Sequence, residues 1–541
     1  MKNILKNFFT NVLINSTIKN QLLFFKFIIL INNRKKILFD LFSLFKTRKI
    51  KSYLDFNRRR IKNKKKYYKN IILIDIFPVA QWIIANSIFT NTLAEKLKAT
   101  IKSFSLYSIS SEIHDIYSSW GCNHNYLIRL NLKQKKKLFI IYQKLLKEIK
   151  NTDDLINFKL NNIWIGLDIY ETILRKGVAT VVLNSFNTRY AFFLGSLYYV
   201  YFDDLFSRGE IKAVVLSHDV YINMGTISKI AQAYDVPVYY VNPREFVKSF
   251  DVHDISQKFK NYKVYFNRLN SDKQKLLIER AKKSISKRIK GNLKIDISYQ
   301  EKSAFIDKKI KRQTNNNDKL KILIATHCFF DNPHAYSFMM FKDFYHWLIH
   351  LGEISKKVNY EWYIKTHRDY LPGTIEIINK IISKYPNIKL VNPETSFHQL
   401  FNEGCKIALT CYGSIGHELP LIGYTVINNS LNPHSSFNFN YHIYNIDEYT
   451  NTLLNLENIN FPNHIEDIYK FYAIHNYIIY SDSYLFKSFQ KYTEEINYDF
   501  SSYKAYHYFM KDPENNLKRF RNNCEKFLVS KYRYLFEEEI I

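Results

Sequence analysis

Two apolar runs decide the fold: IILIDI at residues 71–76 and KILIA at residues 321–325. Each is a continuous run of strand length, which is typical of a strand buried on both faces of a sheet. After each of them, further short apolar runs alternate with stretches of helical spacing. Strands that alternate with helices predict a parallel sheet covered by helices on both faces. We therefore expect an α/β protein with two doubly wound, Rossmann-like domains that face a cleft.

The alternation runs through both blocks of sequence. In the first block we expect strands at 71–76, 101–109, 180–183, 211–216 and 238–241, and helices at 81–100, 134–149 and 225–233. In the second block we expect strands at 321–325, 359–364, 388–391, 407–410 and 425–428, and helices at 338–358, 373–385, 396–403 and from 417.

The chain has 541 residues, a length that predicts two domains with additional segments. We expect a basic amphipathic extension (1–70), a first Rossmann-like domain (71–257), a basic helical linker (258–320), a second Rossmann-like domain (321–450) and a helical C-terminal extension (451–541).

The positive charge is concentrated in two of these segments. The chain has 79 Lys and Arg against 49 Asp and Glu, a net charge of +30. Residues 1–70 hold 19 basic and 2 acidic residues, and residues 258–320 hold 19 and 6, so the rest of the chain is neutral. A nucleic-acid enzyme more often spreads its charge over the binding domain. We therefore favour an anionic membrane surface over nucleic acid as the partner of residues 1–70.

The N-terminal extension is apolar as well as basic. Its longest apolar run, at 22–31, is interrupted by Lys26 and is shorter than the ~20 residues that span a bilayer. No small-residue cleavage site follows it, so we do not expect a signal peptide. Two interpretations remain open: an interfacial segment that lies on lipid, and a helical extension that packs on the protein.

The five cysteines, at 122, 328, 405, 411 and 524, form no C-x-x-C pair. That spacing excludes a disulfide scaffold and a cysteine-based zinc module, and it fits a reducing compartment.

Candidate ligand-binding residues follow the strands of the second block. The run CYGSIGHE at 411–418 places Gly413, Ser414 and Gly416 between a strand and a helix, where backbone N–H groups can approach a phosphate. Glu418 lies in the first helical turn and is a candidate acceptor for ribose hydroxyls. The alternative is an ordinary helix cap, since Ser, Gly and Glu are all common there.

Basic and imidazole side chains follow the neighbouring strands. Lys365, His367 and Arg368 suit the binding of an anionic nucleotide, because charge-assisted bonds to phosphate are strong. The alternative is a solvent-facing basic loop. The loops after 325 and 428 add further candidates for the cleft, namely His327, His334 and His434. None of these loops has a known metal-ligand spacing, so we predict no metal site.

In the first block, His218 and Asp219 follow the strand at 211–216. His218 is a candidate general base because its ordinary pKa lies near neutrality, and Asp219 is the competing base. The alternative is a loop histidine with a structural hydrogen bond. Asp75, at the end of the first strand, is a further candidate for the cleft.

On these residues the chain resembles a known family. The turn at 413–418, with LPLIG at 419–423 and the strand at 425–428, is similar to the donor site of bacterial capsule and surface-polysaccharide glycosyltransferases of the GT-B fold. The run KTH at 365–367 resembles the His-Pro motif of bacterial sialyl- and Kdo-transferases, whose His contacts the phosphate of a CMP-sugar. Arg368 stands in place of that Pro, which leaves CMP specificity open. Residues 165–175 and 214–225 are similar to stretches of the first domain of such proteins.

The resemblance implies transfer of a sugar from a nucleotide-sugar to a capsular polysaccharide or lipid-linked glycan. The second domain would hold the donor through 413–418 and His367, and the first would present the acceptor to His218 or Asp219. The nucleotide-sugar is then a co-substrate, with no other cofactor and no metal. The resemblance also implies a cytoplasmic protein at the inner face of the plasma membrane.

Four alternatives remain open from the sequence. A polyol-phosphate (glycerophosphate) transferase and a nucleotide-sugar epimerase share the architecture. A nucleic-acid-binding protein and a non-catalytic scaffold belong to other classes, and fold alone does not decide between them.

Overall fold

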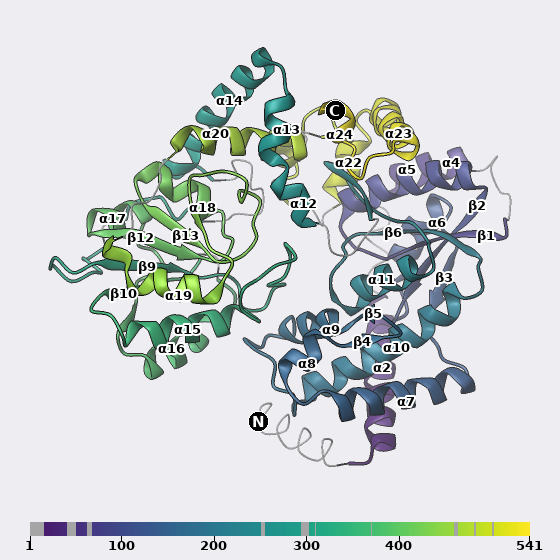
Figure 1. Cartoon of the computed structure of the whole chain (residues 1–541). Coiled ribbons are helices and arrows are strands. Elements are labelled where there is room, and N and C mark those ends of the chain that lie inside the picture. Colours follow the sequence, from purple (N-terminus) through teal and green to yellow (C-terminus); the bar gives the residue numbers. More distant parts are fainter. Residues whose placement is uncertain are drawn as a thin grey trace. The chain divides into compact units, whose positions relative to one another are not determined.

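The computed structural model describes residues 16–40, 50–61, 68–249, 255–293, 302–308, 310–368, 370–458, 464–480, 483–499 and 503–540, without the side chains of 31–40, 255–257, 458 and 539. The chain forms two compact units, which are labelled by element in Figure 1. Unit 1 comprises Met1–Ile173, Val181–Val252 and Ser481–Glu539, and unit 2 comprises Leu174–Thr180, His253–Tyr480 and Ile540–Ile541.

Unit 1 is built on a six-stranded sheet of order β3-β2-β1-β6-β7-β8. Its strands are parallel except β8, which pairs antiparallel with β7. Ile72 of β1 lies between Ile101 of β2 and Ala213 of β6, so β1 is central. The strands are β1 (Asn70–Ile74), β2 (Ala99–Ser105), β3 (His124–Leu127), β6 (Ile211–Leu216), β7 (Val238–Asn242) and β8 (Glu245–Ser249), and β4 (Lys159–Leu160) and β5 (Ile163–Trp164) form a separate hairpin.

Helices cover both faces of this sheet (Figure 1). One face packs against α4, α5, α6, α22 and α23 in a core that includes Ile72, Val215 and Phe520. Figure 1 shows α10 and α11 over the other face. The helices of unit 1 are α2 (Ile18–Asp40), α4 (Lys51–Ile61), α5 (Ala80–Leu97), α6 (Ser111–Ser119), α7 (Leu132–Glu148), α8 (Thr152–Ile156), α9 (Gly166–Leu174), α10 (Phe186–Phe206), α11 (Thr226–Ala233), α21 (Phe489–Glu495), α22 (Lys504–Phe509), α23 (Pro513–Val529) and α24 (Glu537–Ile540).

Unit 2 repeats the same arrangement with all six strands parallel, in the order β11-β10-β9-β12-β13-β14. Ile324 of β9 pairs with Ile364 of β10 and Leu409 of β12. The strands are β9 (Lys321–Ala325), β10 (Glu361–Lys365), β11 (Ile388–Leu390), β12 (Cys405–Thr410), β13 (Thr425–Asn428) and β14 (Tyr441–His442). Counted along each block, both sheets have the order 3-2-1-4-5-6 of a Rossmann fold.

The helices of unit 2 also lie on both faces of their sheet. One face packs against α15, α16 and α19 around Trp347, and the other packs against α17 around Leu400. The helices are α12 (Ile255–Lys260), α13 (Tyr262–Arg268), α14 (Ser271–Ile289), α15 (Phe344–Ser355), α16 (Thr374–Lys384), α17 (Phe397–Asn402), α18 (Ile415–Glu418), α19 (Ile446–Leu454) and α20 (Ile465–Ile474).

The predicted α/β fold with two doubly wound sheets is confirmed, although the strand expected at 180–183 is wrong. No described strand pairs with these residues, which form a turn before α10, and Val182 is 60% exposed. The strands β3, β8 and β14 were not predicted. They lie at or near the sheet edges, where short mixed-polarity strands carry little sequence pattern.

The outer segments belong to the two units rather than forming separate parts. Helix α14 of the 258–320 segment packs against α20 in unit 2, whereas α23, near the C-terminus, packs against α5 in unit 1. Among the described residues, no helix combines the length and the apolar character needed to cross a bilayer. Residues 1–15 of the N-terminal extension lie outside the described residues.

Candidate functional site

Each sheet has one point where the chain reverses its direction across the sheet: between β1 and β6 in unit 1, and between β9 and β12 in unit 2. In open α/β sheets, ligands bind beyond the carboxyl ends of the strands at such a point. The sequence candidates follow these strands, so both points are candidate sites.

In unit 2 a histidine bridges the reversal point. The Nε2 atom of His327, after β9, lies 2.9 Å from Oγ1 of Thr410 at the end of β12, and the backbone N–H of Tyr412 donates to the same Nε2 at 3.4 Å. The ring of His327 stacks on Phe344, with 4.7 Å between centroids and 13° between planes. Burial, with a smaller contribution from His367, lowers the pKa of His327 to about 3. His327 is therefore a neutral acceptor that fixes the floor of the site.

The turn after β12 is partly engaged within the protein. The backbone N–H of Gly413 donates to Oγ1 of Thr410 at 3.2 Å, so this amide and that of Tyr412 both point inward. Ser414 begins α18 without a side-chain capping bond, and its side chain is half-buried. Of the predicted phosphate-binding turn, Ser414 is therefore the side chain best placed for a ligand.

The last residue of this turn has a buried partner. Glu418 accepts a hydrogen bond from Nε of Arg288 on α14, and the two side chains are 2% and 4% exposed. A buried ion pair of this kind holds α14 against α18. The predicted bond from Glu418 to a ribose would have to coexist with it.

Near the carboxyl ends of the second sheet's strands lie four side chains with buried polar atoms that the protein does not satisfy. The amide atoms of Asn428 and Asn440, Nε2 of His434 and Oγ1 of Thr366 have no hydrogen-bond partner among the described residues. These four side chains are 0%, 7%, 1% and 2% exposed. An unsatisfied buried polar group costs ~1–3 kcal/mol, so native proteins keep few of them without a purpose. We call these four residues the unpartnered cluster.

Gly416 connects the cluster to the turn. A Cβ atom added at Gly416 would clash with the ring of His434 and would lie 3.0 Å from Nδ2 of Asn440. The absent side chain thus lets α18 approach both members closely. Burial lowers the pKa of His434 well below its usual value, and it lowers that of the adjacent His417 to about 3. Both imidazoles are neutral and suit a neutral hydrogen-bonding group.

Two of the predicted phosphate ligands are engaged elsewhere. Nζ of Lys365 donates to the carbonyl of Pro393 at 2.8 Å, and Lys365 is 2% exposed inside β10 rather than after it. Burial, and next the charge of Arg368, lower the pKa of Lys365 to about 7. The guanidinium of Arg368 donates to three carbonyls, those of Ser303, Ile306 and Glu394. We therefore leave Lys365 and Arg368 out of the proposed site.

The other histidine candidates lie nearer the surface. His367 is exposed, and its charge helps to lower the pKa of His327. His334 is half-buried in the loop after β9, where its backbone N–H donates to Oδ1 of Asn332 at 2.9 Å.

In unit 1 the reversal point joins Asp75 to Ser217. Oδ2 of Asp75 accepts hydrogen bonds from the backbone N–H of Ser217 at 3.0 Å and from its Oγ. Burial raises the pKa of Asp75 to about 6, although the bonds from Ser217 oppose the shift. The next residue, His218, stacks on Trp82 at 5.2 Å and 16°, and Asp219 is exposed. The structure therefore brings three of the predicted residues to one edge.

A buried ion pair next to this loop was not predicted. Nζ of Lys229 donates to Oδ1 of Asp168 at 2.7 Å, and Oγ1 of Thr226 donates to Oδ2 at 3.0 Å. Burial raises the pKa of Asp168 to about 6 against the pull of Lys229. A Cβ at Gly225 would lie 2.6 Å from Asp168, so the π-helical turn Tyr221–Gly225 packs on this pair. Asp168 lies on α9 and Lys229 on α11, and no sequence motif connects the two positions.

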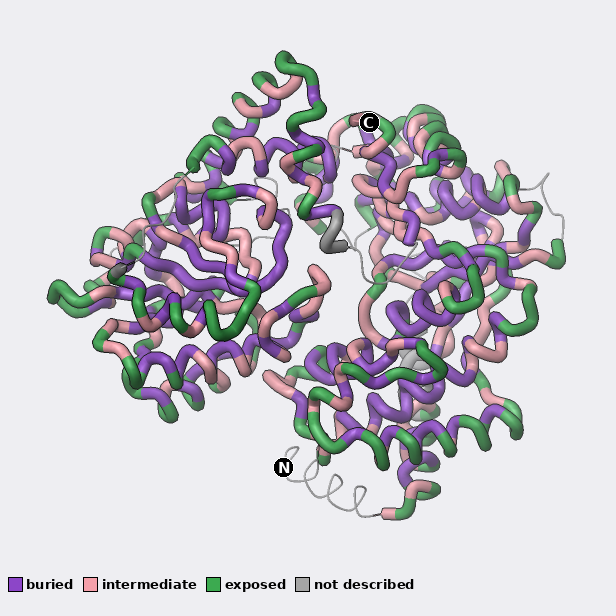
Figure 2. The backbone as a smooth tube through the Cα atoms, viewed as in Figure 1, coloured by how far each residue is buried: buried purple, intermediate pink, exposed green. Residues whose placement is uncertain are grey.

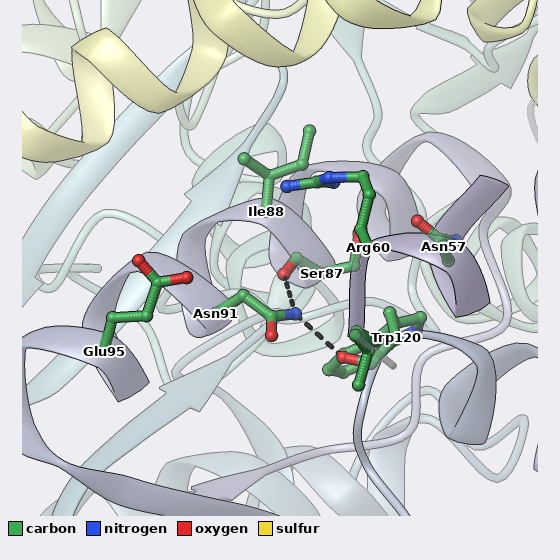
Figure 3. Close-up of a pocket in the computed structure, with 8 residues that line it drawn as sticks. Asn57, Arg60, Ser87, Ile88, Asn91, Glu95 and Trp120 are labelled. Atoms are coloured by element: carbon green, nitrogen blue, oxygen red, sulfur yellow. Dashed lines mark hydrogen bonds between the residues drawn. The ribbon is translucent and has the colours of Figure 1, made fainter. Parts of the chain in front are cut away.

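A recess in unit 1 lies away from both points (Figure 3). Its volume of about 20 Å³ is enough for one water molecule. Asn91 on its wall donates to the carbonyls of Ser87 and Trp120, at 2.8 and 2.9 Å. Since α5 begins at the carboxyl end of β1, Asn91 and Glu95 in its second half lie toward the opposite edge. We do not assign a ligand to this recess.

The sequence matches no protein-family model, and comparison with curated proteins found no match. Among solved structures, KpsC from Thermosulfurimonas dismutans, described as a β-Kdo 2,7 transferase, aligns at 13% identity over 52% of this chain and 80% of its own, with a TM-score of 0.30. A UDP-GlcNAc 2-epimerase from Neisseria meningitidis, bound to UDP-GlcNAc, aligns at 12% identity over 75% and 96%, with a TM-score of 0.20. MurG from Acinetobacter baumannii aligns at 8% identity over 79% and 99%, with a TM-score of 0.22. At TM-scores this low, the likeness says nothing about reaction or substrate.

Proposed function

We propose that the chain is a glycosyltransferase of GT-B type, and that unit 2 binds its nucleotide-sugar donor. The observation that carries this proposal is the unpartnered cluster at the carboxyl edge of the second sheet. Asn428, Asn440 and His434 offer amide and imidazole groups that pair with neutral polar groups such as a nucleobase or sugar hydroxyls. Exposed His367 and half-buried Ser414 add donors suited to a phosphate on the same unit.

Unit 1, in this proposal, activates the acceptor hydroxyl. His218 and Asp219 stay the candidate bases, and the structure favours adding Asp75. A carboxyl group with a pKa of about 6 suits proton transfer near neutral pH. Ser217 holds that carboxyl in place, and the Asp168–Lys229 pair supports the loop that carries His218.

The acceptor we propose is a capsular or lipid-linked glycan, handled by a cytoplasmic protein at the inner face of the plasma membrane. The nucleotide-sugar serves as co-substrate. We expect neither a metal nor another cofactor to be needed, so dialysis against EDTA should leave the activity unchanged.

Donor binding is tested by thermal unfolding with CMP, CDP, UMP, UDP, GDP and ADP, because a ligand that binds only the folded state raises Tm. We expect one nucleotide to raise the Tm of the wild type and to leave Asn440→Ala unshifted. Since Asn440 has no partner within the described part of the chain, Asn440→Ala should keep the ligand-free Tm or raise it.

The matched control is Asn125→Ala in unit 1, whose amide donates to Oγ of Ser105 at 2.7 Å. This variant should keep the nucleotide-dependent shift. If no nucleotide shifts the wild type, or if Asn440→Ala shifts equally, the donor site is wrongly placed.

The reaction is tested with the sugar of the nucleotide that binds. A transferase releases nucleotide only when acceptor is added, whereas an epimerase converts the nucleotide-sugar without an acceptor. Release from a CDP-polyol, and not from a nucleotide-sugar, would favour the polyol-phosphate transferase.

A further inference from the structure

Within residues 18–30, whose side chains the structure describes, helix α2 packs on unit 1 through the side that carries Gln21 and Phe25. Phe25 is fully buried, with its ring centroid 5.3 Å from that of Phe193 and 5.4 Å from that of Tyr190, both on α10. Oε1 of Gln21 accepts a hydrogen bond of 2.7 Å from the hydroxyl of Tyr142 on α7. These contacts fix which side of α2 faces outward.

The outward side of residues 18–30 of α2 carries a row of large apolar side chains. Leu23, Phe27 and Leu30 are 56%, 55% and 49% exposed. Their spacing of four and three residues places them in one stripe along the helix. Lys19 and Lys26, both exposed, border the stripe. Three large apolar side chains in a row on an outer helix are unusual for a surface that meets only water.

Helix α7, which contacts α2 through Tyr142 and Gln21, has an exposed side of similar composition. Leu132 and Ile140 are 77% and 63% exposed, and exposed Lys136 lies between them on the same face. The charge of Lys135 contributes, after burial, to lowering the pKa of Lys26, so the two helices bring their lysines close together. Figure 2 shows exposed residues along the outer side of α7.

The surface is predominantly basic. Residues 18–30 and 132–147 contain no Asp or Glu. They contain eight lysines, at positions 19, 26, 133, 135, 136, 137, 144 and 147, of which Lys137 and Lys144 pair with Asp203 and Glu148. The other six are exposed on the same two helices.

We propose that this α2–α7 face, defined by Leu23, Phe27, Leu30, Leu132, Ile140 and the adjacent lysines, docks on an anionic lipid bilayer. Apolar side chains enter the boundary between headgroups and acyl chains, while the lysines meet the acidic headgroups. A nucleic acid would match the charge but would leave the exposed Leu23, Phe27 and Leu30 side chains without apolar partners. A protein partner would need a matching acidic and apolar groove, whereas an anionic membrane supplies both features over any area. The proposal does not depend on the donor site in unit 2.

The test is co-sedimentation of the full chain with phosphatidylcholine vesicles that contain or lack phosphatidylglycerol. We expect the wild type to bind the anionic vesicles and to be released by salt. Leu23→Ser with Phe27→Ser, and separately Lys135→Glu with Lys136→Glu, should each weaken binding by about tenfold or more. Because all four side chains are exposed, the variants should keep the wild-type circular dichroism and Tm.

Matched controls replace exposed apolar residues elsewhere: Leu276→Ser on α14 and Val529→Ser on α23, which are 69% and 77% exposed in the wild type. Both should bind as the wild type does. The proposal is overturned if the α2 and α7 variants also bind normally, or if Lys282→Glu with Lys283→Glu on basic α14 abolishes binding instead. It is equally overturned if the face holds two copies of the chain together, so that the variants change the mass in light scattering while no form binds vesicles.

Discussion

Asp75→Asn tests whether the reversal point of unit 1 holds a protonated carboxyl group. Asp75 is 7% exposed and accepts two hydrogen bonds from Ser217. Asparagine has almost the same shape and keeps an acceptor for the Ser217 N–H, but it does not titrate. Any difference in pH dependence between the two proteins therefore comes from the carboxyl group.

The sign and size follow from the pKa. Burial raises the pKa of Asp75 from 3.8 to about 6, so the folded chain holds the proton more tightly than the unfolded chain. The stabilisation is complete below the unfolded pKa and is lost as pH rises through about 6. A shift of 6 − 3.8, or about 2.2 units, corresponds to about 3 kcal/mol.

Urea unfolding of both proteins across a series of pH values measures this loss. Relative to Asp75→Asn, the wild type should lose about 3 kcal/mol of unfolding free energy between pH ~4 and ~7. The comparison is needed because Asp168, whose pKa is also raised to about 6, shifts both proteins in the same direction. In the control variant Asp115→Asn, on the surface of α6, the unfolding free energy should change with pH as it does in the wild type. If the unfolding free energy of Asp75→Asn also changes with pH as the wild type's does, Asp75 is already ionised at low pH in the folded state and our assignment of its proton is wrong.

Three further substitutions test the two reversal points. Gly416→Ala should cost about 1–3 kcal/mol and remove the nucleotide-dependent rise in Tm, because the new Cβ clashes with His434; a retained rise would separate Gly416 from the donor site. Lys229→Met should lower the unfolding free energy by about 3–5 kcal/mol, because it leaves the Asp168 carboxylate buried without its partner, and adding Asp168→Leu should restore part of that loss. A double variant less stable than Lys229→Met alone would contradict this. Arg368→Lys should lower the unfolding free energy by about 2–4 kcal/mol, because the guanidinium bonds to three carbonyls, while the nucleotide-dependent rise in Tm persists; loss of that rise would return Arg368 to the donor site.

The central strands could be predicted because each is buried on both faces and so reads as a continuous apolar run. The run at 321–325 is the clearest case, since β9 has these bounds and all five residues are buried. The run at 180–183 is also apolar, but no described strand pairs with it and its Val182 is exposed. Apolar composition therefore identifies a buried strand only when the topology supplies neighbours. Edge strands such as β14 (Tyr441–His442) are too short to carry a pattern at all.

The candidate site was predictable in position but not in detail. The topology alone places the ends of β1, β6, β9 and β12 at the reversal points, which is why Asp75, His218 and His327 lie there. Whether a side chain near such an end points toward a ligand depends on partners far away in sequence. Lys365 illustrates this, because its Nζ donates a hydrogen bond to the carbonyl of Pro393. The asparagines of the unpartnered cluster belong to no motif, and only the structure shows that they lack partners within the described residues.

The two reversal points differ in a way that separates their roles. At the reversal point of unit 1 the two buried carboxyl groups are paired, Asp75 with Ser217 and Asp168 with Lys229, although Oε1 of buried Gln81 at the start of α5 has no partner among the described residues. In unit 2 Asn428 and Asn440 alone leave four amide atoms unsatisfied. At ~1–3 kcal/mol for each group, that cost is comparable with the whole ~5–15 kcal/mol of stability of a folded domain. A polar ligand that completes those bonds would recover this cost. Unit 2 is therefore the unit that a polar ligand should stabilise. We expect a bound nucleotide to slow the hydrogen exchange of backbone amides in unit 2. Slower exchange only in β1 and β6 of unit 1 would reverse the assignment of donor and acceptor units.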